Sequence, residues 1–176
     1  YAVGGLLAHS EAITAITCPT VNSYNGLVPT VGGFEGGVHT WAPVNITYGH
    51  NNRSAQFRLP QNRYCIENRA ADLTMNVYLA LGMTISSAMD GIKNKIDPGK
   101  PTDQDLYQMT DSEFKKLGIK RLPKNLMQAI EALRINKLTD EVMGSVMKKS
   151  FLSYKNDEWE RYHQAVTDWE VKEYLR

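Results

Sequence analysis

The hydrophobic pattern of the chain changes its period near Asp72, and this change limits the fold more than any other feature. Before Asp72, runs at residues 40–48, 54–59 and 64–69 are typical of strands, and in the second run apolar and polar side chains alternate. After Asp72 the apolar spacing is helical. Antiparallel strands followed by helices predict an α+β fold in one domain or a large part of one.

Glycines, a proline and a capping box indicate where the helices begin and end. Gly91 and Gly118 are each expected to end a helix, because glycine readily adopts the terminating conformation. The Thr-Asp-Ser-Glu sequence at residues 110–113 is a capping box, and Pro123 occupies a first helical position. The expected helices are residues 2–15, 72–90, 110–118 and 123–136, with two more between 139 and 176.

A long loop is expected over residues 17–37, where clusters of Gly, Pro and Asn follow one another. Loops of this length inside a compact domain usually carry function. Glu35 lies between two pairs of glycines in this loop, so its carboxylate is carried by a segment flexible enough to close over a site. An exposed turn with no further role fits the same pattern.

Charge and cysteine content exclude several classes of partner. The 20 Lys and Arg residues against 19 Asp and Glu give a formal charge of +1, so neither nucleic acid nor an acidic membrane is an expected partner. No apolar run approaches the ~20 residues of a membrane helix. Cys18 and Cys65 could pair, but two reduced thiols of a cytoplasmic protein are the favoured interpretation.

A cluster of charged residues follows the expected strands. Glu67 and Arg69 are two apart and should project from the same face, with Arg53, Arg58 and Arg63 nearby in the sequence. Arginines keep the pKa of a neighbouring carboxylate low, and an ionised carboxylate suits Mg²⁺ or Mn²⁺. Guanidinium groups bind phosphate or carboxylate bidentately. The cluster indicates a site for a metal-bound nucleotide, although a salt-bridged sheet face fits the same spacing.

Arg53 has the wrong parity to share a strand face with Arg58. If both side chains serve one site, Arg53 must precede the strand or a bulge must intervene. The four histidines form no metal-ligand pattern.

Several short motifs follow one another along nearly the whole chain. They are Asn-Ser-Tyr at 22–24, Asn-Arg-Ser-Ala at 52–55, Arg-Leu-Pro at 58–60, Ile-Glu-Asn-Arg at 66–69, Asn-Val-Tyr-Leu-Ala at 76–80, Met-Asp-Gly-Ile at 89–92, Leu-Pro at 122–123 and Glu-Trp at 158–159. The Asn-Arg-Ser-Ala run, the nearby Arg-x-Pro and the Glu-x-Arg are the most specific. In this order the motifs resemble the C-terminal catalytic half of glutamine synthetases, and the resemblance covers nearly the whole chain.

The resemblance implies the curved antiparallel sheet of the family's catalytic domain followed by a helical C-terminal region, with ATP and Mg²⁺ or Mn²⁺ bound. Glu67 resembles a metal-binding glutamate. Arg53 and Arg58 resemble the arginines that hold the ATP phosphates and the phosphoryl group in transfer, and Arg69 resembles one that binds the substrate glutamate. Glu35 resembles the flap glutamate that shields the intermediate and helps to deprotonate the amine.

The resemblance also implies the substrates L-glutamate, a small amine and ATP, and a homo-oligomer of stacked rings. Residues 1–176 would be the C-terminal part of the catalytic domain, without the small N-terminal domain and the other metal ligands, and alone should be inactive. Tyr107 stands where some bacterial members carry a tyrosine that is adenylylated.

The sequence departs from the family in ways that bear on the substrate. Asn25 and Gly26 stand where the family usually has a basic pair whose arginine contacts the substrate α-carboxylate, and Cys65 replaces another arginine, for which Arg63 is the candidate substitute. The loop before Glu35 is also longer. These changes resemble the branch of γ-glutamylmethylamide synthetases, so methylamine is the favoured amine. An ammonia-using glutamine synthetase and a non-catalytic relative remain the alternatives.

Overall fold

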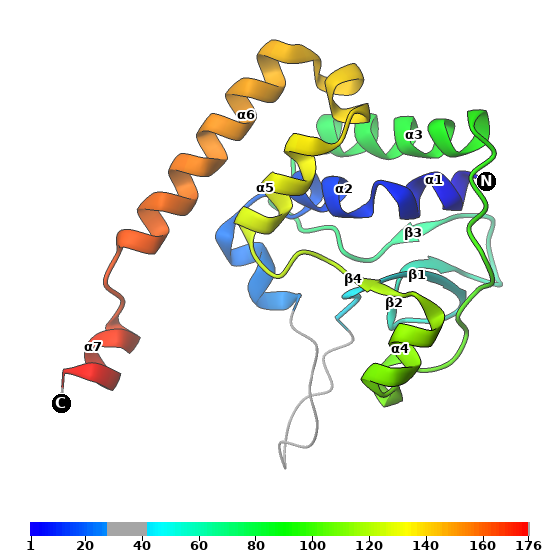
Figure 1. The fold of residues 1–176 in the computed structure, drawn as a ribbon, viewed down its shortest axis with the longest axis horizontal. Coiled ribbons are helices and arrows are strands. Elements are labelled where there is room, and N and C mark those ends of the chain that lie inside the picture. The colour runs from blue at the N-terminus through cyan, green and yellow to red at the C-terminus, as the bar shows by residue number, and fades with distance from the viewer. Residues whose placement is uncertain (28–41, 176) are drawn as a thin grey trace.

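The computed structural model describes residues 1–27 and 42–175, whose elements are shown in Figure 1. The strands are β1 (Asn45–His50), β2 (Ala55–Leu59), β3 (Glu67–Asn68) and β4 (Lys120–Arg121). The α-helices are α1 (Ala2–Ala8), α2 (Ser10–Thr17), α3 (Val77–Lys93), α4 (Asp111–Leu117), α5 (Leu126–Ile135), α6 (Leu138–Gln164) and α7 (Asp168–Tyr174). Two 3₁₀ helices complete the fold, η1 (Val21–Gly26) and η2 (Leu106–Gln108).

The four strands form one mixed sheet in the order β3-β2-β1-β4. The outer pairs are antiparallel, whereas β1 and β2 are parallel, with Tyr48 opposite Phe57 and His50 opposite Leu59. The α+β class is confirmed, but the expected antiparallel sheet is wrong for this central pair. Alternation along a strand determines which side chains share a face, and it carries no information about the direction of the neighbouring strand. Residues 51–54 bring the chain back so that β2 runs in the same direction as β1.

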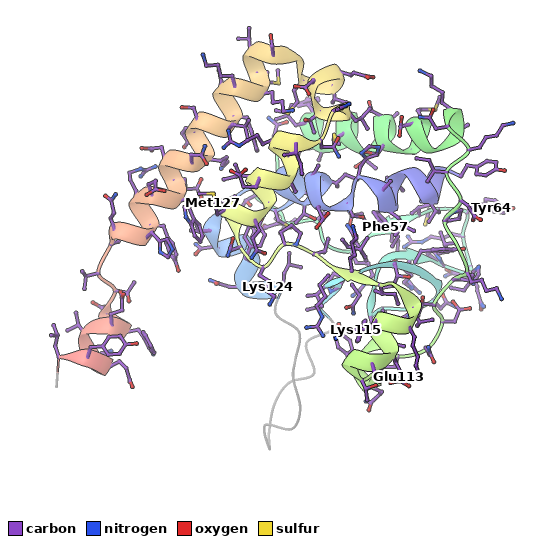
Figure 2. All side chains as sticks on the ribbon, in the orientation of Figure 1. Phe57, Tyr64, Glu113, Lys115, Lys124 and Met127 are labelled. Carbon is purple, nitrogen blue, oxygen red and sulfur yellow. The ribbon has the colours of Figure 1, made fainter. Side chains whose placement is uncertain are left out.

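The helices cover the sheet from two sides. In Figure 1, α1, α2 and α3 lie above the strands and α4 lies below them. The main core is one cluster of buried side chains that includes residues of α2, α5 and β2, and Figure 2 shows Phe57 of β2 below the helix α1. Its fully buried side chains include Phe57, Ile13, Ile16, Ile130 and Leu133. The sheet edge that carries the charged residues is therefore backed by a rigid apolar layer.

Helices α1 and α3 touch at a pair of glycines, which corrects one expected helix end. A Cβ atom on Gly91 would lie 2.4 Å from the backbone nitrogen of Gly5 and 2.3 Å from the carbonyl oxygen of Tyr1. Gly91 therefore lies inside α3, which continues to Lys93, and the expected stop at Gly91 is wrong. The glycine permits close helix packing here and does not terminate the helix.

The other helix limits are partly as expected. The capping box at Thr110 and Glu113 is present, and Gly118 ends α4 in the left-handed conformation with φ of 64°. Pro123 does not open the next helix, because the Asn125 side chain accepts the Gln128 N–H and caps α5 further along the chain. The expected N-terminal helix is divided into α1 and α2 at His9, whose ring contacts Asp90 on α3 at 2.9 Å.

The C-terminal region forms α6 and α7, which confirms the expected pair of helices. Helix α6 is kinked at Gly144, which has φ of 69°, and then projects away from the sheet toward α7 (Figure 1). None of the helices in the described part of the chain has the length and apolar character needed to cross a membrane.

Candidate active site

An ion pair between neighbouring strands forms the centre of the charged cluster. Arg58 on β2 lies opposite Glu67 on the antiparallel strand β3, and Nη1 of Arg58 is 2.9 Å from Oε2 of Glu67. Arg63, in the turn that joins the two strands, donates to the other carboxylate oxygen. Both oxygens of Glu67 are thus bound by guanidinium groups, one from Arg58 and one from Arg63.

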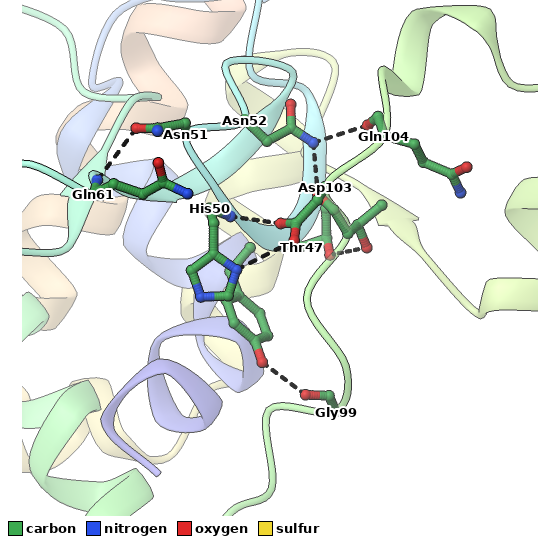
Figure 3. A network of polar contacts seen from close by, with 10 residues as sticks. Thr47, His50, Asn51, Asn52, Gln61, Gly99, Asp103 and Gln104 are labelled. Atoms are coloured by element: carbon green, nitrogen blue, oxygen red, sulfur yellow. Dashed lines mark hydrogen bonds and ion pairs between the residues drawn. The ribbon is translucent and has the colours of Figure 1, made fainter.

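Asn51 adds a neutral contact to this ion pair. Its side-chain oxygen accepts from Nη2 of Arg58 at 3.0 Å and from the backbone N–H of Gln61 at 3.3 Å. Figure 3 shows the contact between Asn51 and Gln61. The Asn51 backbone is left-handed, with φ of 52°, a conformation that asparagine tolerates better than most residues. The sequence reasoning did not find Asn51, although it directly precedes the Asn-Arg-Ser-Ala run.

Arg69 turns toward Arg53, although the spacing of two predicted that it would face the same space as Glu67. Its Nη1 donates to the backbone carbonyl oxygen of Arg53. Partial burial lowers the pKa of the Arg69 guanidinium; the nearby Tyr107 acts in the opposite direction, and the positive charges of Arg53 and Arg58 lower the pKa further. Arg69 therefore lies close enough to Arg53 and Arg58 to be repelled by their charges, and a bound anion would relieve this repulsion.

Arg53 precedes β2, which begins at Ala55. Of the two explanations for its parity relative to Arg58, the position before the strand is therefore correct. Its side chain is exposed, while Asn52 and Ser54 on either side are buried. The exposed guanidinium therefore stands on a turn whose neighbouring side chains face inward. Glu35, the remaining residue of the predicted site, lies outside the described residues.

Tyr107, which stands where some bacterial members of the family carry an adenylylated tyrosine, belongs to the same region. The tyrosine is half-buried, and its hydroxyl donates to the backbone carbonyl oxygen of Ala42. Burial raises the pKa of Tyr107 to about 12, against the opposing effect of the Arg69 charge. No local sequence pattern could have revealed that Tyr107 lies close to Ala42 and Arg69, because both residues are remote from it in sequence.

A cavity of about 900 Å³ opens beside the ion pair and is formed mainly by the turn between β2 and β3. Its wall includes Leu59, Ile66 and Arg63, so apolar surface lies next to a guanidinium that binds Glu67. Tyr64 on the same turn points outward, as Figure 2 shows. A flat apolar ring linked to a charged group would suit a cavity of this size and lining.

The described residues do not by themselves fit a divalent metal. Within residues 1–27 and 42–175, no three His, Cys, Asp or Glu side chains come together to hold an ion. Both Glu67 oxygens are bound by arginines, so an ion there would displace a guanidinium group and take its other ligands from elsewhere. Glu67 is the carboxylate of the described cluster that could contribute one ligand.

Comparison with known proteins agrees with this geometry. The family described as "Glutamine synthetase, catalytic domain" matches residues 1–174. A glutamine synthetase of Archaeoglobus fulgidus is 41% identical over 180 residues, covering 99% of this chain and 35% of the relative. A glutamate–methylamine ligase of Methyloversatilis universalis is 44% identical over 171 residues, covering 97% of this chain and 37% of the relative.

Solved structures give the same result. A GmaS complex with ADP superimposes with a TM-score of 0.83 at 34% identity, over 99% of this chain and 38% of that one. GmaS without ligand gives a TM-score of 0.81 at 32% identity, over 99% and 37%. An α+β sheet with an arginine-rich edge and a family match over almost its whole length define the class: the chain belongs to the glutamine synthetase catalytic-domain family. It spans little more than a third of the length of these relatives.

Proposed function

We propose that the full-length protein is an ATP-dependent ligase that joins a small amine to the γ-carboxylate of L-glutamate, with γ-glutamylmethylamide as the favoured product. The observation that carries the proposal is the cluster of Arg53, Arg58 and Arg69, in which positive charge exceeds the single carboxylate of Glu67. Such a cluster suits phosphate and carboxylate ligands. Family membership and the names of the relatives support the same activity.

Each residue of the site has its own role in the proposed reaction. Arg53 and Arg58 bind the ATP phosphates and stabilise the phosphoryl group in transfer, and Arg69 binds the substrate glutamate. Glu35 accepts a proton from the incoming amine, and Glu67 would contribute one ligand to Mg²⁺ or Mn²⁺. The ADP bound to a solved relative supports nucleotide use, and the cavity beside Arg63 is large enough for the base. A bound divalent metal would supply further positive charge beside the phosphate oxygens.

The reaction has two steps. A γ-carboxylate oxygen of glutamate attacks the terminal phosphorus of ATP, ADP leaves, and γ-glutamyl phosphate forms. The neutral amine then attacks the acyl carbon, phosphate leaves with the former carboxylate oxygen, and the surplus proton on nitrogen passes to Glu35. Negative charge collects on phosphoryl oxygens in both steps, so fixed guanidinium groups lower both barriers, each by up to ~3–4 kcal/mol.

The choice of methylamine rests on the departures from the family at Gly26 and in the loop before Glu35. Gly26 ends η1, and a side chain there would meet no atom of the described residues within 4 Å. Gly26 stands where most members of the family have an arginine, so the substrate α-carboxylate must be held by other groups. One additional methyl group is worth at most ~1–3 kcal/mol of selectivity, or about 10–200-fold.

A competition assay tests the choice of amine. Full-length protein with ATP, Mg²⁺ and glutamate is given ammonia or methylamine, and kcat/KM is compared. We expect a preference for methylamine within the range above. A preference for ammonia would assign the protein to the glutamine-forming group, which is the second candidate because most of the compared relatives are glutamine synthetases.

A non-catalytic relative is the weaker alternative. Such a protein would have no reason to hold Glu67 between two arginines or to crowd Arg69 against Arg53. A third alternative is a nucleotide-binding module unrelated to this family. The family match over residues 1–174 excludes it. If the full-length protein released no phosphate from ATP with any of these amines, the non-catalytic interpretation would be correct.

The proposal also covers the domain to which the chain belongs, the cellular compartment and the oligomeric state. Residues 1–176 would form the C-terminal part of the catalytic domain, assembled in the cytoplasm as a homo-oligomer of stacked rings. Cys18 and Cys65 are both free thiols, which suits a reducing compartment. Separation by size of the full-length protein, with its mass measured by light scattering, tests the assembly.

A further inference from the structure

The turn that carries Arg53 is unusually short for its topology. Parallel neighbours in a sheet are generally joined by a crossover of a dozen or more residues, because the chain must return to the starting end. Here residues 51–54 alone join β1 to β2. A segment this short has too few backbone partners of its own to fix its path, so side chains and neighbouring segments must do so.

Asn52 supplies most of the fixing contacts. Its side-chain nitrogen donates to the carbonyl oxygens of Thr102 at 2.6 Å and Gln104 at 2.9 Å. Its side-chain oxygen accepts from the backbone N–H of Ser54 at 2.8 Å and from the Ser54 hydroxyl at 2.6 Å. Figure 3 shows the amide of Asn52 directed at the segment that contains Gln104. Both donor hydrogens and the oxygen are used, so no other side chain of this size could replace asparagine.

Ser54 completes the connection on the other side of Arg53. It is fully buried, and its hydroxyl oxygen accepts the backbone N–H of Leu106 at 3.0 Å. The segment at Thr102 also approaches β1 so closely that a Cβ atom on Gly49 would lie 2.2 Å from its carbonyl oxygen. The 102–106 segment is therefore bound tightly along both β1 and the turn, and Asn52 and Ser54 form what we call the turn clamp.

The turn clamp encloses an exposed residue, Arg53. Arg53 lies between the two buried side chains, and its backbone carbonyl accepts from the guanidinium of Arg69. A shift of the turn would thus move two cluster arginines together. Buried and fully bonded polar groups of this kind define one geometry, because any alternative leaves a donor or acceptor unpaired.

We propose that Asn52 and Ser54 are positioning residues: they place the Arg53 side chain for phosphate binding, and they place the Arg53 carbonyl that orients Arg69. The inference rests on the proposed phosphate role of Arg53. A positioning role differs from a purely structural role in one respect. Loss of the turn clamp should weaken phosphate binding when Arg53 is present and should have little effect when Arg53 has been replaced.

A double-mutant cycle with ADP measures this dependence in the full-length protein. Ser54→Ala and Arg53→Ala are made singly and together, and the Kd of ADP at fixed Mg²⁺ is determined by calorimetry. Asn52→Asp is the second clamp variant, because it keeps the shape and the acceptor but loses both donors. Thr47→Val is the matched control: it removes a buried 3.0 Å contact to Thr102 without touching the turn.

We expect Ser54→Ala to raise the Kd of ADP by about 10-fold in the native background and by less than about 2-fold when Arg53 is already alanine. Asn52→Asp should behave in the same way. Thr47→Val should lower the thermal midpoint and change the Kd by a similar small factor in both backgrounds. This pattern would support positioning, because general destabilisation acts equally with and without Arg53.

Equal fold-changes in both backgrounds, or an unchanged Kd in both clamp variants, would overturn the inference. An unchanged Kd in Arg53→Ala would also overturn it, since Arg53 would then bind no phosphate. Failure of the ligase proposal is recognised separately: the protein would release no phosphate from ATP with glutamate and amine. In that case a non-additive ADP cycle would still support the turn clamp.

Discussion

Glu67 and its two arginine partners give the most direct test at the scale of single residues. Glu67→Gln keeps the shape of the side chain but removes the charge that holds Arg58 and Arg63. We expect phosphate release by the full-length protein to fall by ~10²-fold or more, because the charged groups around the phosphates lose their arrangement. The thermal midpoint should fall by only a few degrees, since the pair is partly solvated.

The control for Glu67 is Glu131→Gln. Glu131 also forms an ion pair with an arginine, at 3.2 Å from Arg134, but on the exposed surface of α5. Turnover should remain at the native level in this variant. Native turnover in Glu67→Gln across a range of Mg²⁺ concentrations would contradict the assigned role.

Asp72 gives a prediction about pH. A hydrogen bond from the Ser23 side chain, followed by the Thr74 backbone N–H, lowers the pKa of Asp72 below its ordinary 3.8. A carboxyl with a depressed folded-state pKa stabilises the fold above its unfolded pKa, and this stability is lost as the pH falls through the folded value. We expect Asp72→Asn to lower the thermal midpoint at neutral pH and to reduce its acid dependence below about pH 4.

Asp157→Asn is the comparison for Asp72. Asp157 pairs with Arg161 at 2.8 Å on the exposed surface of α6. Its replacement should leave the acid dependence as in the native protein. Identical acid dependence in native protein and Asp72→Asn would show that the Ser23 contact contributes nothing to stability.

At the scale of the elements, the contact between α1 and α3 depends on Gly91. Gly91→Ala would place a methyl group within 2.4 Å of the Gly5 backbone, so the two helices must separate. Overpacking of this kind typically costs about 1–3 kcal/mol. We expect a clear fall in the thermal midpoint of the full-length protein.

Gly82 in the same helix is the matched control. The nearest atom to a Cβ placed there is Val142 Cγ1 at 3.8 Å, an ordinary contact distance. Gly82→Ala should therefore stabilise the helix by about 0.5–1 kcal/mol through its better helix propensity. Equal effects of the two substitutions would show that close packing at Gly91 is unimportant.

Gly91 also shows which parts of the fold could be predicted from the sequence. The capping box at Thr110 predicted the start of α4, because its signal is complete within four residues. Gly91 was misread, because a glycine that ends a helix and one that admits a second helix look alike in one dimension. The parallel direction of β1 and β2 was missed for a similar reason, since it depends on contacts of the turn with residues 102–106.

At the scale of the whole molecule, the arrangement of the candidate site could be predicted only partly from the sequence. The sequence predicted that Arg53, Arg58, Arg63 and Glu67 belong to one cluster, and the position of Arg53 before its strand is one of the two alternatives that strand alternation allowed. The pairing of Arg58 with Glu67 depends on the register of β2 and β3 and was not predicted. The approach of Tyr107 to Arg69 was not predicted either, because it joins segments separated by a long stretch of chain. The glycines around Glu35 indicated a loop that can close, but its role toward the amine and the significance of Gly26 came from the family resemblance alone.

The central claim is that a chain with this arginine cluster serves a ligase that works through an acyl phosphate. Transfer of oxygen tests it most directly. Full-length protein is given ATP, Mg²⁺, methylamine and glutamate labelled with ¹⁸O in the γ-carboxylate, and the released phosphate is examined by mass spectrometry. We expect one ¹⁸O atom in each phosphate, because the attacking carboxylate oxygen leaves with phosphorus. Phosphate released without ¹⁸O would mean that water attacks ATP directly, and the account would be contradicted.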